Sequence, residues 1–104
     1  MCGRYTLFDD TQDDRLIDII NEVNRKHPME PVKTGEIFPA NPAPVLLSAA
    51  GGQTVEAERM IWGFPHFKGS GVIINARAET AVEKPMFRGS LEARRCAVPS
   101  TGFY

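Results

Sequence analysis

The chain has 104 residues, a length that suits a single domain with a modest hydrophobic core. Its 13 acidic and 12 basic side chains nearly cancel, so no overall positive field draws it to nucleic acid, and any binding surface must come from local sorting of charge. Two cysteines, Cys2 and Cys96, are too few for a secreted disulfide scaffold, no apolar run approaches a membrane span, and no leader pattern opens the chain. The composition therefore predicts a soluble, cytoplasmic protein with no membrane contact.

The first predicted element is a helix over residues 11–26. Apolar residues recur there at helical spacing, at Leu16, Ile17, Ile20 and Val23. Asp9, Asp10 and Thr11 offer capping oxygens before this stripe, and Pro28 ends the helix.

The middle of the chain predicts an extended segment followed by a hairpin. Residues 28–44 contain five prolines and are expected to run as an extended path on the surface. Residues 45–49 and 54–62 read as two strands joined by a turn at Gly51-Gly52. Trp62, at the end of the second strand, is assigned to the core.

Shorter elements follow. Residues 72–74 predict a buried strand, and the polar run 75–80 comes directly after it, where chemistry would sit. A short helix is predicted over residues 90–95 and a strand over residues 96–98. A turn at residues 99–102 then leads into the start of a further strand.

The two cysteines receive different predictions. Cys96 lies in an apolar strand and is predicted to be an inert, buried thiol. Together with Cys2, His27 and His66 it shows none of the paired spacing of a zinc site, so we expect no metal and no cofactor.

Cys2 directly follows the initiator methionine, which aminopeptidases remove before small side chains. The mature chain would then carry a thiol and a free α-amine on one carbon, an aminothiol that condenses with an aldehyde and closes through sulfur to a thiazolidine. The usual pKa of an α-amine is about 7.7–8.0 and that of a thiol about 8.5, so both groups are partly nucleophilic near neutral pH. From position alone, an ordinary free cysteine that happens to come second remains an open alternative.

Five motifs, taken together, resemble one known family. They are Met1-Cys2-Gly3-Arg4-Tyr5, Trp62-Gly63-Phe64-Pro65, Asn75-Ala76-Arg77-Ala78-Glu79-Thr80, Arg94-Arg95-Cys96 and Pro99-Ser100-Thr101-Gly102-Phe103-Tyr104. Their order and spacing resemble the SOS response-associated peptidase (SRAP) domain across the whole chain.

The resemblance implies both a fold and a function. The fold is α+β, with a mostly antiparallel, curved sheet forming an open, partial barrel, one main N-terminal helix and a short second helix. The function is recognition of abasic sites in single-stranded DNA, with a covalent thiazolidine link through Cys2 after autoproteolytic removal of Met1. When bound to DNA, the cytoplasmic protein would associate with the nucleoid.

The resemblance also assigns catalytic roles. Cys2 is the nucleophile, and Asn75 matches the family's active-site asparagine, which lies close to the N-terminal cysteine and hydrogen-bonds the amine or the sugar. Without the resemblance, Asn75 would read as a turn-forming asparagine after a strand.

Five further residues are candidate DNA contacts. Arg4 and Arg77 match arginines that bind phosphates beside the lesion, and Arg88 is a looser match for the same role. Phe67 is expected to stack on a base or to cover the core. Pro42 falls near a contact loop of the family, although Pro39 replaces an asparagine that is usual earlier in that loop.

The sequence bears on two further points, the role of Glu79 and the extent of the domain. Glu79 would pair with Arg77 or Arg4, or stay solvated. In the family, the motif ending at Tyr104 runs on into a glutamate that handles protons, and a histidine follows later in the domain. We therefore expect residues 1–104 to be the N-terminal half of an SRAP domain, truncated before its C-terminal half.

An open sheet edge in such a half-domain favours self-association. Two alternatives to the covalent sensor stay open. One is a non-catalytic fragment that keeps only a DNA-binding or scaffold surface, and the other is a thiol peptidase that acts on other proteins. Whether the chain works as a peptidase or lyase is left open by the sequence.

Overall fold

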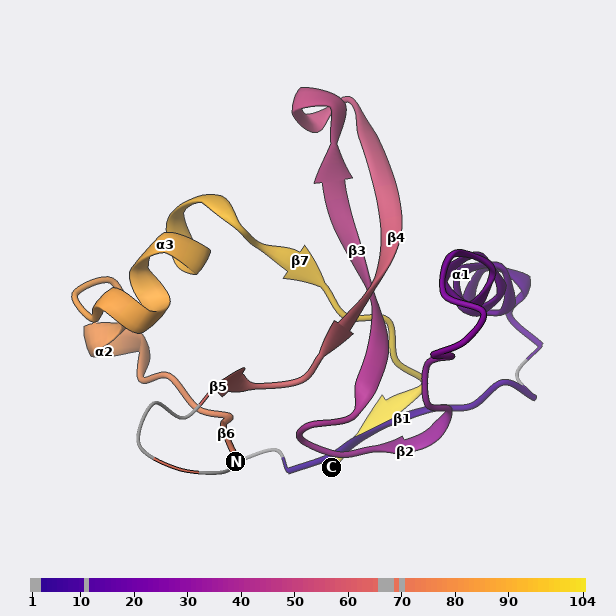
Figure 1. Cartoon of the computed structure of the whole chain (residues 1–104), viewed down its shortest axis with the longest axis horizontal. Helices are drawn as coiled ribbons and strands as arrows, with labels where there is room; N and C mark the ends of the chain where they lie inside the picture. Colours follow the sequence, from indigo (N-terminus) through magenta and orange to yellow (C-terminus); the bar gives the residue numbers. More distant parts are fainter. Residues whose placement is uncertain (1–2, 11, 66–68, 70) are drawn as a thin grey trace.

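The computed structural model describes residues 3–10, 12–65, 69 and 71–104. These residues form three α-helices and three small antiparallel sheets, which do not close into a barrel within this part of the chain. The helices are α1 (Asp14–Lys26), α2 (Ala78–Ala81) and α3 (Pro85–Ala93). In Figure 1, a long β-hairpin stands between α1 on one side and α2 with α3 on the other. The predicted α+β class with an open antiparallel sheet is confirmed.

Helix α1 begins three residues later than the predicted start because Asp13 caps it. The Asp13 carboxylate accepts a hydrogen bond from the backbone N–H of Arg15 at 3.0 Å. The Arg15 guanidinium binds the same carboxylate at 3.1 and 3.2 Å. Within the helix, Ile20 and Val23 are buried and Leu16 and Ile17 are half-buried, so the predicted apolar stripe is confirmed.

The predicted hairpin is also confirmed. It consists of β3 (Pro42–Ala49) and β4 (Thr54–Ile61), joined by the short 3₁₀ turn η1 (Ala50–Gly52). Gly51 in this turn has a φ of 66°, a left-handed conformation that glycine adopts without strain. The two-residue strand β7 (Cys96–Ala97) pairs with the other edge of β3.

A second sheet brings the two ends of the described chain together. Strand β1 (Tyr5–Leu7) lies between β2 (Gly35–Ile37) and β8 (Gly102–Phe103), antiparallel to both. The prediction that residues 28–44 form only a surface path is wrong. Ile37 and Val32 are 0% and 7% exposed, because β2 turns this segment into the core.

The core lies where this sheet, α1 and the base of the hairpin meet. Its buried cluster consists of Leu7, Ile20, Val23, Val32, Ile37 and Ala43. Full burial of one such aliphatic side chain contributes about 1.5–3 kcal/mol. Trp62 is half-buried and packs against the cluster, which confirms its assignment to the core.

The remaining elements form a smaller unit. Strands β5 (Phe64–Pro65) and β6 (Val72–Ile73) pair with each other, and β6 is half-buried where a fully buried strand was expected. Helix α3 begins at Pro85, five residues before the predicted start, since proline suits the first helical position. None of the described helices is long and apolar enough to cross a membrane.

The prediction of a buried Cys96 is wrong, because the structure leaves this thiol exposed. Strand β7 is only two residues long and lies at the edge of its sheet, with both of its residues exposed. Apolar neighbours in sequence therefore did not make this a core position.

Candidate functional site

The N-terminal motif leads into the middle strand of a sheet. Cys2 lies outside the described residues, and the description starts at Gly3, which is exposed. Two residues further on, Tyr5 begins β1, whose partners on both sides fix its course. The described part of the N-terminal motif therefore leads into a strand with a fixed position.

Hydroxyl groups join this motif to the motif at the other end of the chain. The backbone N–H of Phe8 donates to Thr101 Oγ1 at 3.2 Å, and the Thr6 hydroxyl donates to the carbonyl of Gly102 at 3.2 Å. Thr6 Oγ1 and Thr101 Oγ1 are 3.0 Å apart. Since the Thr6 proton already points to Gly102, Thr101 is the donor in this last bond. The two motifs thus form one continuous structure (Figure 1).

Arg4 is held by an acidic and an aromatic neighbour. Its Nη1 lies 3.5 Å from Glu36 Oε1 of β2, and both side chains are 43% exposed. Its guanidinium carbon lies 4.1 Å from the centre of the Tyr104 ring, and the Tyr104 hydroxyl donates to Glu36 Oε1 at 3.3 Å. A half-exposed guanidinium fixed in this way is a suitable phosphate ligand.

Trp62 and Gly63 connect the N-terminal strand to the β5–β6 unit. The rings of Tyr5 and Trp62 are 5.6 Å apart at an angle of 54°. Gly63 has a φ of 109°, and a Cβ added there would come within 2.7 Å of Val72. Only glycine allows this close approach, so this position sets where β6, and the residues after it, can lie.

Asn75 and Arg77 follow β6 directly. Both are exposed, and Arg77 is the residue that precedes α2, where its carbonyl accepts the N–H groups of Thr80 and Ala81 at 3.2 and 2.8 Å. Glu79, in the first turn of α2, is exposed as well. The carboxylate that neighbours Arg4 is that of Glu36.

Arg88 is exposed on α3. Its helix is attached to the preceding sheet through Phe87, whose ring meets that of Phe64 edge-on at 5.1 Å and 73°. Pro42, the first residue of β3, is half-buried opposite Ile61. Phe67 and His66 lie outside the described residues.

Apart from Pro42 in the hairpin, the described candidates thus fall into two groups. Arg4 belongs to the sheet of β1, β2 and β8, whereas Asn75, Arg77 and Arg88 belong to the unit of β5, β6, α2 and α3. Figure 1 places β1 and β6 along the same lower side of the molecule. Trp62 and Gly63 lead from the hairpin into the second group, and the segment through β7 leads from α3 back to β8.

An apolar hollow of about 510 Å³ lies between the two groups. Its lining comes from β1, the hairpin, α3 and the segment around β7, and consists of Tyr5, Ala43, Val45, Met60, Ile61, Trp62, Gly63, Phe64, Ser90, Arg94, Cys96 and Val98. Burial raises the pKa of Tyr5, and the nearby Cys96 adds to this in its charged form. Within the described ranges, no three His, Cys, Asp or Glu side chains gather as a metal site would require.

Sequence reasoning missed Glu36 and Tyr104 as neighbours of Arg4. Tyr104 is the last residue of the last motif, and Glu36 lies in a three-residue strand. The sequence pattern at these two positions does not predict a contact with Arg4. The usable signal was the lone carboxylate in Gly35–Ile37, an acid within a short strand next to an N-terminal arginine.

Comparison with known proteins places these motifs in a family. The family model described as SOS response associated peptidase (SRAP) matches residues 1–104. Over 113 residues, the chain is 36% identical to "Abasic site processing protein YoqW" and 35% identical to "Abasic site processing protein YobE", both of Bacillus subtilis (strain 168). Over 105 residues it is 28% identical to "Abasic site processing protein YedK" of Escherichia coli (strain K12).

Each alignment covers 100% of this chain, but 47%, 48% and 47% of these three relatives in the same order. The chain therefore spans about half the length of the curated relatives it matches. Since the family model matches every residue, the chain belongs to the SRAP family.

Proposed function

We propose that this chain binds abasic sites in single-stranded DNA and links to them covalently through Cys2. The observation that carries the proposal is the family match over residues 1–104, together with relatives that are named abasic site processing proteins. Removal of Met1, by autoproteolysis as the family's peptidase label suggests, frees the α-amine that the reaction needs.

The reaction proceeds in two steps. An abasic deoxyribose opens to an aldehyde, and the Cys2 amine condenses with it to an imine, with loss of one water. The Cys2 thiolate then adds to the imine carbon, and the nitrogen takes up a proton. The product is a five-membered thiazolidine, and no oxidant or reductant is consumed.

The geometry of Arg4 supports this proposal. Its guanidinium lies two residues from the nucleophile, is half-exposed, and is oriented by Glu36 and Tyr104. A phosphate bound there would hold the sugar near residue 2, and such positioning raises the rate of an intramolecular step. Arg77 and Arg88 would contact the backbone further along the strand, with Phe67 and Pro42 beside it and Asn75 near the sugar.

The test is a crosslinking assay with the mature protein, after intact mass spectrometry has verified that Met1 is absent. A single-stranded oligonucleotide with one abasic site should give an adduct that survives a denaturing gel. Cys2→Ala should abolish the adduct, while Cys96→Ser, a change in the exposed second cysteine, should leave it intact. An adduct that persists in Cys2→Ala would contradict the proposal.

Two further controls separate the chemical steps. Cys2→Ser keeps the amine, so it should form only an imine, which is lost on the gel unless borohydride reduces it. An oligonucleotide with a tetrahydrofuran site, which has no aldehyde, should bind without forming an adduct. If the wild type also fails to react with the abasic site, the chain is a non-catalytic fragment that keeps a binding surface at most.

We also propose that residues 1–104 are the N-terminal half of an SRAP domain and that the other half packs over the apolar hollow. Ile61 and Val98 on its wall are 54% and 51% exposed, and Phe103 on β8 is 82% exposed. An exposed apolar surface of this kind marks an interaction site. In the chain studied alone, the same surface and the open strand edges favour self-association.

Sedimentation over a range of concentrations tests this second proposal. We expect reversible association that the paired change Ile61→Ser and Val98→Ser weakens. A pair of changes at exposed apolar residues outside the hollow, Met29→Ser and Val82→Ser, should have no effect. A wild-type chain that stays monomeric and unfolds in one sharp, cooperative transition would count against an uncovered half-domain.

A further inference from the structure

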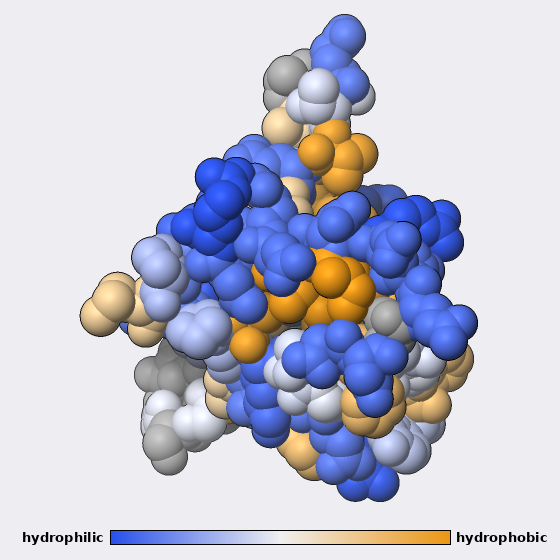
Figure 2. All heavy atoms as spheres, turned by 90° about the vertical axis from the view of Figure 1, so that its right-hand side faces the viewer, coloured by the Kyte–Doolittle hydropathy of each residue, from blue (hydrophilic) through white to orange (hydrophobic). Residues whose placement is uncertain are grey.

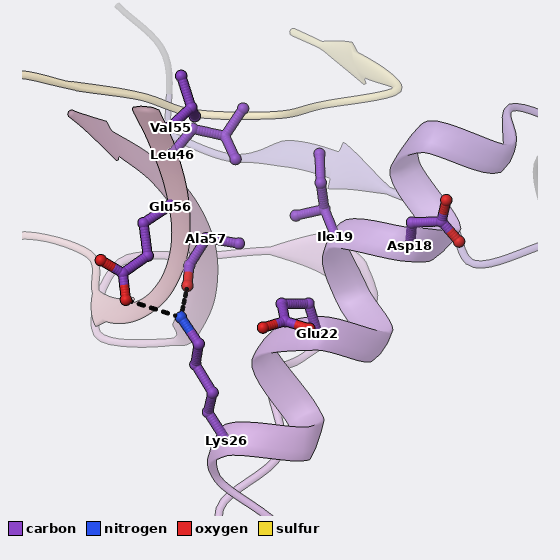
Figure 3. A pocket seen from close by; sticks show the side chains of 8 residues that line it. All are labelled: Asp18, Ile19, Glu22, Lys26, Leu46, Val55, Glu56 and Ala57. Atoms are coloured by element: carbon purple, nitrogen blue, oxygen red, sulfur yellow. Dashed lines mark hydrogen bonds and ion pairs between the residues drawn. The ribbon is translucent and has the colours of Figure 1, made fainter. Parts of the chain in front are cut away.

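A second groove lies on the far side of the hairpin from α2 and α3, between α1 and β4 (Figure 3). Its volume is about 540 Å³. The helix contributes one wall through Asp18, Ile19 and Glu22, and the hairpin contributes the other. Of the candidate DNA contacts that the structure describes, Arg4, Pro42, Arg77 and Arg88, none lines this groove.

The floor of the groove is aliphatic. Ile19 and Leu46 are half-buried there, and Val55 on the hairpin side is 73% exposed. Figure 2 shows apolar surface at the centre of this face, enclosed by hydrophilic residues. A contiguous apolar floor within a polar rim is the usual arrangement of a protein interaction site.

The rim carries more negative than positive charge. Asp18 and Glu22 line the helix side and Glu56 the strand side, while Lys26 is the single cation among the lining residues. Lys26 Nζ is already engaged, since it donates to Glu56 Oε1 at 3.0 Å and to the carbonyl of Ala57 at 2.7 Å. Lys26 therefore closes one end of the groove, and Asp18 and Glu22 give it a net negative charge.

Glu22 stays ionised under ordinary conditions. The Arg25 guanidinium donates to its carboxylate at 2.6 Å, and this hydrogen bond lowers the pKa of Glu22. Arg25 itself is 71% exposed and does not line the groove. Arg25 offsets part of the charge of Glu22, as Lys26 offsets that of Glu56. Asp18 therefore leaves the rim net negative, and the groove favours a ligand with positive charge.

We propose that this groove binds a protein segment that carries aliphatic side chains flanked by lysine or arginine. The aliphatic side chains would occupy the floor formed by Ile19, Leu46 and Val55, and the flanking cations would face Asp18 and Glu22. This goes beyond the DNA chemistry proposed above, and the hairpin stands between the groove and the unit of α2 and α3 that carries Arg88 (Figure 1). A single strand of nucleic acid does not fit this description, since its charge has the wrong sign.

The binding test uses a short synthetic peptide that alternates leucine and lysine and carries a fluorescent label. Two matched peptides replace every lysine with glutamate, or every leucine with serine. Fluorescence anisotropy should show binding for the first peptide and clear weakening for both of the others. The position is read from amide chemical shifts in a nitrogen-15 NMR spectrum, which should move at Ile19, Val55 and Ala57.

Two groove variants test the two features separately. Val55→Ser should weaken binding by about threefold to tenfold through the apolar contact. Asp18→Asn with Glu22→Gln should weaken it by roughly the same factor and flatten its salt dependence. The matched changes Val82→Ser and Glu83→Gln, on exposed residues next to α2, should leave the affinity unchanged.

Several results would overturn the proposal. Shifts confined to Ile61 and Val98 would place the peptide in the apolar hollow. Equal binding of the glutamate peptide would remove the charge argument, and displacement of the peptide by undamaged single-stranded DNA would make the surface a nucleic-acid site. Self-association that Val55→Ser abolishes would make a second copy of the chain the occupant.

Discussion

The guanidinium of Arg4 lies 4.1 Å above the ring of Tyr104, although the two residues stand at opposite ends of the described chain. The contact exists because β1 and β8 are neighbours in one sheet. Through its hydroxyl, Tyr104 also binds Glu36, the carboxylate that pairs with Arg4. The first and last motifs of the family are therefore parts of one local structure around a single arginine.

Removal of the Tyr104 ring should weaken DNA binding. A cation over an aromatic face at an exposed site is worth about 0.5–1 kcal/mol, so Tyr104→Leu should raise the dissociation constant by about twofold to fivefold. Tyr104→Phe keeps the ring and should bind nearly as the wild type does. The affinity is measured by fluorescence anisotropy of a labelled oligonucleotide with a tetrahydrofuran site. Phe103→Leu is the matched aromatic control. An equal loss of affinity in Tyr104→Leu and Phe103→Leu would show that Tyr104 has no special role.

Neutralising Glu36 should have the opposite effect. Its carboxylate competes with phosphate for Arg4, and an exposed ion pair of this kind is worth about 0.2–1 kcal/mol. Glu36→Gln should therefore tighten non-covalent DNA binding by about twofold to fivefold and steepen its salt dependence. Asp10→Asn removes an exposed negative charge elsewhere and controls for the change in net charge. Weaker DNA binding in Glu36→Gln would mean that the Glu36 carboxylate mainly orients Arg4.

The hydroxyl chain between Thr6 and Thr101 should be measurable as a coupling energy. Thr6→Val and Thr101→Val should each lower the free energy of unfolding by about 1 kcal/mol, because each removes hydrogen bonds between the two motifs. The double variant should lose less than the sum, by about 0.5 kcal/mol or more. Urea unfolding of all four proteins checks this, and strictly additive losses would argue against the hydrogen bond at 3.0 Å.

How far the fold could be predicted depended on the length of each element. Helix α1 and strands β3 and β4 extend over 13, 8 and 8 residues, long enough for periodicity and turn residues to identify them. Strands β2 and β8 have three and two residues, so no pattern can develop in them. They form because β1 offers an edge on each side, which is a tertiary effect.

The candidate site divides in the same way. Motifs alone gave Arg4, Asn75 and Arg77, because a motif specifies residue types along the chain. They could not give Glu36, which reaches Arg4 from a separate strand. The error at Cys96 has a related cause, since an apolar sequence does not reveal whether another element covers the strand.

Gly63 should be the least replaceable of the glycines that have a positive φ. Gly35→Ala introduces only backbone strain, because its φ is 88° and no heavy atom lies within 4 Å of the added Cβ. That strain should cost about 1–3 kcal/mol. Gly63→Ala combines similar strain with a contact of 2.7 Å to Val72, so its loss in thermal unfolding should clearly exceed that of Gly35→Ala. Equal losses would show that β5 and β6 can separate at little cost.

The cap of α1 should make its stability depend on pH in a defined direction. Hydrogen bonds from the Arg15 side chain and backbone lower the pKa of Asp13 below its ordinary value of 3.8. A group with a depressed folded pKa stabilises the native state above its unfolded pKa, and this contribution is lost as the pH falls through the folded pKa. The stabilisation should therefore be full near neutral pH, begin to decline at about pH 4, and be lost as the pH falls through the lowered pKa of Asp13 in the folded protein.

Two variants separate the charge of Asp13 from its capping role. Asparagine also caps helices, so Asp13→Asn should keep most of the helix stability near neutral pH while reducing its loss in acid. Asp13→Ala should lower the thermal midpoint at every pH. Circular dichroism gives the thermal midpoints between about pH 2.5 and pH 6. Because the pKa values of Glu22 and Glu58 are lowered too, they also make the midpoint depend on pH. The contribution of Asp13 is therefore read from the difference in midpoint between the wild type and Asp13→Asn. A difference that stays constant over this range would mean that the ionised Asp13 carboxylate does not contribute through Arg15.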